Sequence, residues 1–111
     1  VLTTGDRDPW HPAAIRGSAG LHFAQPVVRI TGLVPGDRPL IALDPDGAPL
    51  NRTRLPDRAL LAFGSERRGL STTVADAADL RLAIPMRPGV SSLNLATSVA
   101  VVLYRWSTAA R

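Results

Sequence analysis

The sequence predicts an α/β domain built on a parallel β-sheet. Two short runs, residues 40–43 and 59–63, are apolar at every position, which is typical of strands covered by helices on both faces. These runs lie within the expected order strand, helix, strand, strand, strand, helix, strand, helix. The 111 residues are 45% hydrophobic and 20% charged, so we expect them to fold as one small globular domain around one core.

The amino-terminal third should contain two strands and a helix. Residues 1–4 are expected to form a short strand, and two X-Pro steps break the chain after it. Pro12 can open a helix, which we expect over residues 13–20 because a glycine lies at its end. The β-branched residues within 21–31 favour an extended segment.

The two apolar runs in the middle of the chain are each followed by turn-forming residues. The run at 40–43 should stop at the sequence Asp-Pro-Asp-Gly at 44–47, which is a strong turn signal. The run at 59–63 ends in a glycine. Ser71 can cap a short helix that ends near residue 78, and residues 80–84 should form the next strand.

The last helix is expected to begin at a cap formed by Ser91 or Ser92 and to reach about residue 107. Apolar residues cover nearly all of its faces, so it should be buried on more than one side, in its own domain or against a second subunit. The longest apolar stretch, 95–104, is interrupted by polar residues and is too short to span a membrane. No signal peptide pattern precedes it at the amino terminus.

Composition excludes several kinds of site. The absence of cysteine rules out disulfides, thiolate zinc sites, iron–sulfur clusters and cysteine nucleophiles, and suits a cytoplasmic protein. The only histidines, His11 and His22, do not have the spacing of a helical zinc pair, so we expect no metal site. The chain begins with Val1 and its one methionine is Met86, so we expect it to be a piece of a longer protein.

All thirteen basic residues are arginine, and the net charge is +4. This usage can reflect genomic bias, or it can serve a polyanion such as RNA, because the guanidinium fork matches phosphate. The central segment is basic, and its charged side chains form either a solvated face or an RNA surface. Its members are Arg52, Arg54, Arg58, Arg67 and Arg68, with Asp57 and Glu66 as the acidic residues.

Three loops at strand ends carry the candidate site. They contain the sequences FGSERRGLS at 63–71, IPM at 84–86 and SSLNL at 91–95. The carboxyl ends of parallel strands meet at one edge of a sheet, so these loops can converge there. Gly64 would let the backbone of the first loop approach a ligand.

Together these loops resemble the second and third motifs of the SpoU (TrmH-like) family of RNA methyltransferases, within the SPOUT class. The earlier sequence HPAAIRGSAGLHFAQPV, at 11–27, resembles the segment that precedes them in that family. The resemblance implies a carboxy-terminal trefoil knot whose loops bind S-adenosyl-L-methionine, and transfer of a methyl group to a ribose 2′-hydroxyl of tRNA or rRNA. It also implies a homodimer through the last helix. A base-methylating relative, or a noncatalytic RNA-binding or assembly domain of the same fold, is the alternative.

The resemblance assigns roles to individual residues. The residues that match cofactor-binding positions are Gly64, Ile84, Met86 and Leu93. Those that match catalytic positions, where they orient the reacting groups, are Glu66, Ser92 and Asn94. RNA contacts are assigned to Arg16, Ser18, Arg67 and Arg68.

Each assignment has a simpler alternative. Glu66 can pair in solvent with Arg67 or Arg68, and Ser92 or Asn94 can simply cap the last helix. The family's earlier motif, an asparagine followed by a catalytic arginine, is not found in the sequence. We therefore expect that arginine to lie upstream of the chain's first residue.

Overall fold

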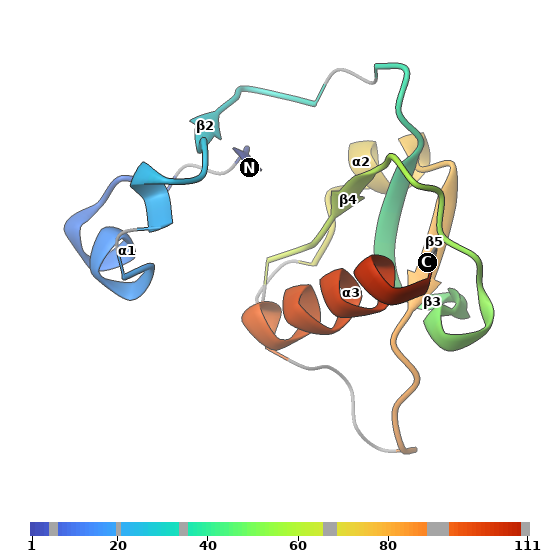
Figure 1. The fold of residues 1–111 in the computed structure, drawn as a ribbon. Helices are drawn as coiled ribbons and strands as arrows, with labels where there is room; N and C mark the ends of the chain where they lie inside the picture. The colour runs from blue at the N-terminus through green and yellow to red at the C-terminus, as the bar shows by residue number, and fades with distance from the viewer. Residues whose placement is uncertain (5–6, 20, 34–35, 66–68, 89–93, 110–111) are drawn as a thin grey trace. The chain divides into compact units, whose positions relative to one another are not determined.

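The computed structural model divides into two compact units, Val1–Val34 and Pro35–Arg111 (Figure 1). The residues that the structure describes are 1–4, 7–19, 21–33, 36–65, 69–88 and 94–109.

The first unit pairs its two short strands in parallel. β1 (Leu2–Thr3) lies beside β2 (Val28–Arg29), and α1 (Pro12–Gly17) lies between them in the chain. Pro12 opens α1, as predicted, and the Nδ1 atom of His11 caps it by accepting a hydrogen bond from the backbone N–H of Ala13 at 3.1 Å. The first strand and the helix start are therefore confirmed.

Two predictions in this unit were wrong. The helix ends at Gly17 and does not reach residue 20, because the chain turns at Ala19, whose φ of 52° is left-handed. The segment 21–31 is not extended throughout, since Leu21–Phe23 forms a 3₁₀ turn and β2 covers only Val28–Arg29. Hydrogen bonds from the His22 side chain to Ser18 and Pro9 stabilise this turn, and they override the local preference for a strand.

The second unit contains a three-stranded sheet in the order β4-β3-β5, and all its neighbouring strands are parallel. Its strands are β3 (Leu40–Pro49), β4 (Leu60–Ala62) and β5 (Leu80–Ala83). Ile41 in the central strand pairs with Leu61 on one side and Leu80 on the other. The predicted parallel sheet is thus confirmed, with β4 and β5 slightly shorter than expected.

The two helices of this unit begin at side-chain caps. α2 (Thr72–Ala77) begins after Ser71, whose hydroxyl accepts a hydrogen bond from Val74 N–H at 3.3 Å, as predicted. α3 (Leu95–Ala109) begins after Asn94, whose Oδ1 accepts from Thr97 N–H at 2.8 Å. Asn94 therefore caps α3. The predicted caps, Ser91 and Ser92, lie outside the described residues.

The core of this unit joins the sheet to α3, which crosses in front of the strands in Figure 1. Ile41, Leu82 and Val102 are fully buried, and Leu50 and Leu55 complete the cluster. The last two residues come from a 3₁₀ turn and the loop after it, which the sequence analysis left unassigned. The indole N–H of Trp106 donates to the carbonyl of Pro56 at 2.7 Å and ties that loop to α3.

The prediction that the strand stops at 44–47 was wrong, because this sequence interrupts β3 without ending it. Leu43 and Ala48 both pair with Leu82, so the residues between them form a bulge and pairing then resumes. The bulge packs directly on β5. A Cβ atom at Gly47 would lie 2.6 Å from the carbonyl carbon of Arg81, so only glycine permits this contact.

Only one stripe of α3 is covered within its unit. Val102 is fully buried, whereas Leu103 is 44% exposed and Tyr104 is 73% exposed. The expectation that this helix is buried on more than one side is therefore not met by the unit itself. In the described part of the chain, no helix combines the length and the apolarity needed to span a membrane.

Adjacent valines on α3 test this packing. Val102→Ala should lower the free energy of unfolding by about 1.5–3 kcal/mol, because it removes buried methyl groups and leaves a cavity. Val101→Ala should cost less than about 1 kcal/mol, because its side chain is 37% exposed. Urea denaturation measures both values. Equal losses would show that α3 does not pack on the sheet through Val102.

Candidate functional site

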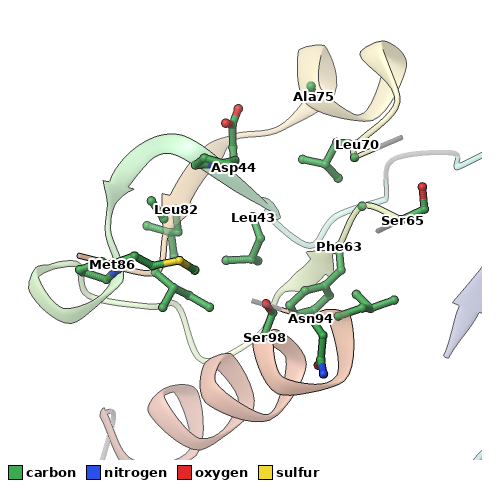
Figure 2. Close-up of a pocket in the computed structure, with 17 residues that line it drawn as sticks. Leu43, Asp44, Phe63, Ser65, Leu70, Ala75, Leu82, Met86, Asn94 and Ser98 are labelled. Carbon is green, nitrogen blue, oxygen red and sulfur yellow. The ribbon is translucent and has the colours of Figure 1, made fainter. Parts of the chain in front are cut away.

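The second unit contains a pocket of about 880 Å³ beside the bulge of β3 and the carboxyl ends of β4 and β5 (Figure 2). Leu43 and Asp44 line it from β3, Phe63 and Gly64 follow β4, and Ile84 follows β5. The beginning of α3 closes another side. Its size and its position at the edge of a parallel sheet are typical of a small-molecule site.

The predicted convergence of the three loops is confirmed for the residues described. Gly64, Ile84, Met86 and Asn94 all line this one pocket. Their chemical roles remain predictions. The predicted site residues that lie outside the described part of the chain are Glu66, Arg67, Arg68, Ser92 and Leu93.

Gly64 lines the pocket, but the structure gives a different reason for its glycine from the one predicted. A Cβ atom at this position would overlap the backbone of Gly69 and Leu70. The loop closes on itself here, because Gly69 N–H donates to Ser65 O at 2.9 Å and Ser65 N–H donates to Gly69 O at 3.2 Å. The closure of this loop therefore requires a glycine at position 64, whether or not a ligand binds.

One side of the pocket is apolar. Figure 2 shows the side chains of Leu43, Leu82 and Met86 gathered beside one another, with Phe63 nearer to the start of α3. Leu82 is fully buried and belongs to the core, so this side is held by the packing of the sheet. Such a surface suits a flat ring system or a hydrocarbon chain.

The start of α3 contributes polar groups. The Oδ1 atom of Asn94 is used as the helix cap, so the simpler explanation of this residue as a capping side chain is confirmed. Its amide nitrogen has no hydrogen-bond partner among the described residues and can donate to a ligand. Ser98 lies one turn later, and its hydroxyl points up from α3 in Figure 2.

Sequence reasoning missed Asp44 and Ser98. Asp44 was interpreted only as part of a turn, although it directly follows the apolar run at 40–43, which was expected to be a strand of the parallel sheet. Ser98 was interpreted only as a polar interruption of an apolar helix. Its spacing of four residues from Asn94 places both on one helix face, and that signal could have identified it.

The other predicted contact residues, Arg16 and Ser18, belong to the first unit. The Ser18 hydroxyl donates to Ile15 O at 2.9 Å and lies 2.7 Å from Nδ1 of His22. Nε2 of His22 lies 2.7 Å from Pro9 O, so both ring nitrogens contact protein atoms. Ser18 thus holds the 3₁₀ turn against α1. Whether it or Arg16 also contacts RNA remains a prediction.

Trp10 packs against two other rings within the first unit. Its ring meets those of His22 and Phe23 edge-on, with centroids 5.0 and 6.0 Å apart. Across the described ranges, no group of three or more histidine, aspartate or glutamate side chains could hold a metal ion.

Residues 1–104 match the sequence profile of the SpoU rRNA Methylase family. The chain belongs to this family. This membership confirms the resemblance stated from the three loops. The parallel α/β fold also agrees with the solved SpoU structures.

Individual relatives extend the comparison. The chain is 30% identical over 118 residues to an uncharacterized tRNA/rRNA methyltransferase of Mycoplasma pneumoniae, with 97% of this chain and 49% of that protein covered. It is 45% identical over 58 residues to the tRNA (cytidine(34)-2'-O)-methyltransferase of Burkholderia pseudomallei, with 46% and 37% covered.

Among solved structures, the SpoU methyltransferase AviRb of Streptomyces viridochromogenes, in complex with the cofactor AdoMet, matches with a TM-score of 0.84 and 27% identity. The match covers 95% of this chain and 47% of that one. The chain therefore spans about half the length of these full-length relatives.

The closure of the loop on Gly64 can be tested by a single methyl group. Gly64→Ala should lower the free energy of unfolding by about 1–3 kcal/mol, because the backbone of Gly69 and Leu70 must move to admit a Cβ atom. Gly36→Ala is the matched control, since nothing lies within 4 Å of a Cβ atom there. If the two variants unfold at the same urea concentration, the loop does not close as described.

Proposed function

We propose that the pocket binds S-adenosyl-L-methionine and that the protein methylates a ribose 2′-hydroxyl of tRNA or rRNA. The observation that carries this proposal is the meeting of Gly64, Ile84, Met86 and Asn94 in one pocket of a SpoU-family chain. The relatives support it, because one is named a tRNA 2′-O-methyltransferase and another was solved with AdoMet.

The lining of the pocket fits this cofactor. Leu43 and Met86, with Leu82 buried beside them, offer an apolar surface to an adenine ring and exclude water from it. Backbone groups of the loops around Gly64 and Ile84 would hold the polar edges of the ligand. The cofactor supplies an electrophilic methyl group on a sulfonium, and the protein aligns the ribose oxygen with it and helps remove its proton.

Further roles extend this proposal to the rest of the predicted site. Leu93 would join the cofactor-binding residues, and Glu66 and Ser92 would orient the reacting groups beside Asn94. RNA would be bound by basic and polar side chains at Arg16, Ser18, Arg67 and Arg68. These assignments are supported by the family motifs and by the convergence of the neighbouring loops.

The proposal includes the architecture that family membership favours. Residues 1–111 would form one SpoU-type domain with a carboxy-terminal trefoil knot, and the protein would act in the cytoplasm. Family membership supports the knot, and the absence of cysteine suits the cytoplasm.

We also propose that α3 forms the interface of a homodimer. Its exposed surface includes large apolar side chains, with Leu95 at 37%, Leu103 at 44% and Tyr104 at 73% exposure. An apolar helix surface of this kind is unfavourable in water and is typical of a protein–protein interface.

Asn94 provides the sharpest test of the activity. Asn94→Asp keeps the cap on Thr97 but removes the amide donor, whereas Asn94→Ala removes both. We expect both variants of the full-length protein to lose most 2′-O-methylation of RNA, while only Asn94→Ala loses about 1 kcal/mol of stability.

The readout is mass spectrometry of 2′-O-methylnucleotides after incubation with tRNA and rRNA. Full activity in Asn94→Asp would show that the amide does not orient the reacting groups. Methylated bases, or RNA binding without any methylation, would replace the proposal by a base methyltransferase or a noncatalytic domain.

The dimer is tested by placing a charge on α3. Leu103→Asp should convert the protein to a monomer in sedimentation velocity at micromolar concentration, because a desolvated carboxylate would oppose association. Thr73→Asp, on the exposed side of α2, is the control and should leave the assembly unchanged. A parent protein that sediments as a monomer would overturn the proposed interface.

A further inference from the structure

Arg81 connects two walls of the pocket without lining it. Its side chain leaves β5, and Nη1 lies 3.5 Å from Oδ2 of Asp44 in the bulge of β3. Nη2 donates to the carbonyl of Ala75 in α2 at 2.9 Å and lies 4.0 Å from Oδ1 of Asp76. Asp44 and Ala75 both line the pocket, so one planar guanidinium joins the bulge to α2.

The carboxylate of Asp44 is held on both oxygens. While Oδ2 faces Arg81, Oδ1 accepts a hydrogen bond from Asp46 N–H at 2.9 Å. The Asp44 side chain is only 19% exposed, so its contact with Arg81 is more protected from water than an ordinary surface ion pair. Two partners therefore fix the conformation of the first bulge residue.

The backbone of Arg81 holds the other end of the bulge. Gly47 packs against the Arg81 peptide so closely that a Cβ atom would lie 2.7 Å from the carbonyl oxygen. The residues between these two contacts pair with neither neighbouring strand. Without the guanidinium, the Asp44 end of this wall would lose its ion pair and its link to α2.

We infer that Arg81 is a positioning residue of the cofactor pocket. It fixes the position of the β3 bulge at Asp44 relative to α2. This inference rests on the proposed function. When the wall is already ordered in the empty protein, ligand binding loses less conformational entropy, and the affinity is higher. The ion pair is half-exposed on the arginine side, so its effect on the stability of the empty protein should be small.

The test is calorimetric titration of S-adenosylhomocysteine into the full-length protein. Arg81→Ala should bind the ligand about three- to tenfold more weakly than the parent, with little change in the unfolding temperature of the empty protein. Arg81→Lys should not restore the affinity. An ammonium group lacks the planar fork of donors with which the guanidinium contacts Asp44 and Ala75 at the same time. Arg38→Ala removes an exposed guanidinium elsewhere in the unit and should bind as the parent does.

A double-variant cycle separates positioning from direct contact. Asp44→Asn should also weaken binding, and Arg81→Ala should add little to it, because both changes break the same contact. Additive losses would show that the two residues act independently and would overturn the inference. Unchanged affinity in Arg81→Ala, recovery by Arg81→Lys, or an equal loss in Arg38→Ala would overturn it as well.

The parent protein distinguishes this inference from the proposed function. If the parent does not bind S-adenosylhomocysteine, the proposed function fails, and the positioning role fails with it. If the parent binds and Arg81→Ala binds equally well, only the positioning role is wrong.

Discussion

The parallel pairing of β3 with both neighbouring strands determines where everything else in the second unit lies. Ile41 pairs with β4 and β5 and is fully buried, so the central strand has no free edge and no solvated face at this point. Parallel strands must all end on the same side of a sheet. The loops that follow β4 and β5 and the bulge of β3 are therefore brought to one edge, where the pocket forms.

The elements that the sequence predicted correctly are those whose signals are local. Continuous apolar runs identified β3 and β4. Ser71 identified the start of α2, because its hydroxyl accepts a hydrogen bond from the backbone N–H three residues later. The errors depend on distant contacts. The turn at Leu21–Phe23 is held by His22 against Pro9, and the bulge of β3 rests on the backbone of Arg81. Neither contact can be inferred from neighbouring residues.

The candidate site divides in the same way. The motif glycine and the residues of the strand ends could be placed at one edge because parallel topology alone brings them there. The physical reason for Gly64 could not be foreseen, since it depends on how the loop returns to Gly69. Asp44 and Ser98 were missed because an aspartate in a turn or a serine in a helix does not by itself indicate a ligand.

Three parts of the pocket wall are breaks in regular structure, and a specific contact holds each of these breaks. The bulge of β3 is held by Asp44 and Arg81, the loop after β4 by Ser65 and Gly69, and the start of α3 by Asn94 and Thr97. Regular strands and helices use up their backbone hydrogen bonds internally, so only such breaks leave backbone groups free to face a ligand. A break with no such contact would be mobile and would have to be ordered by the ligand. The sheet thus determines where the pocket lies, and these short contacts determine how well its shape is formed in advance.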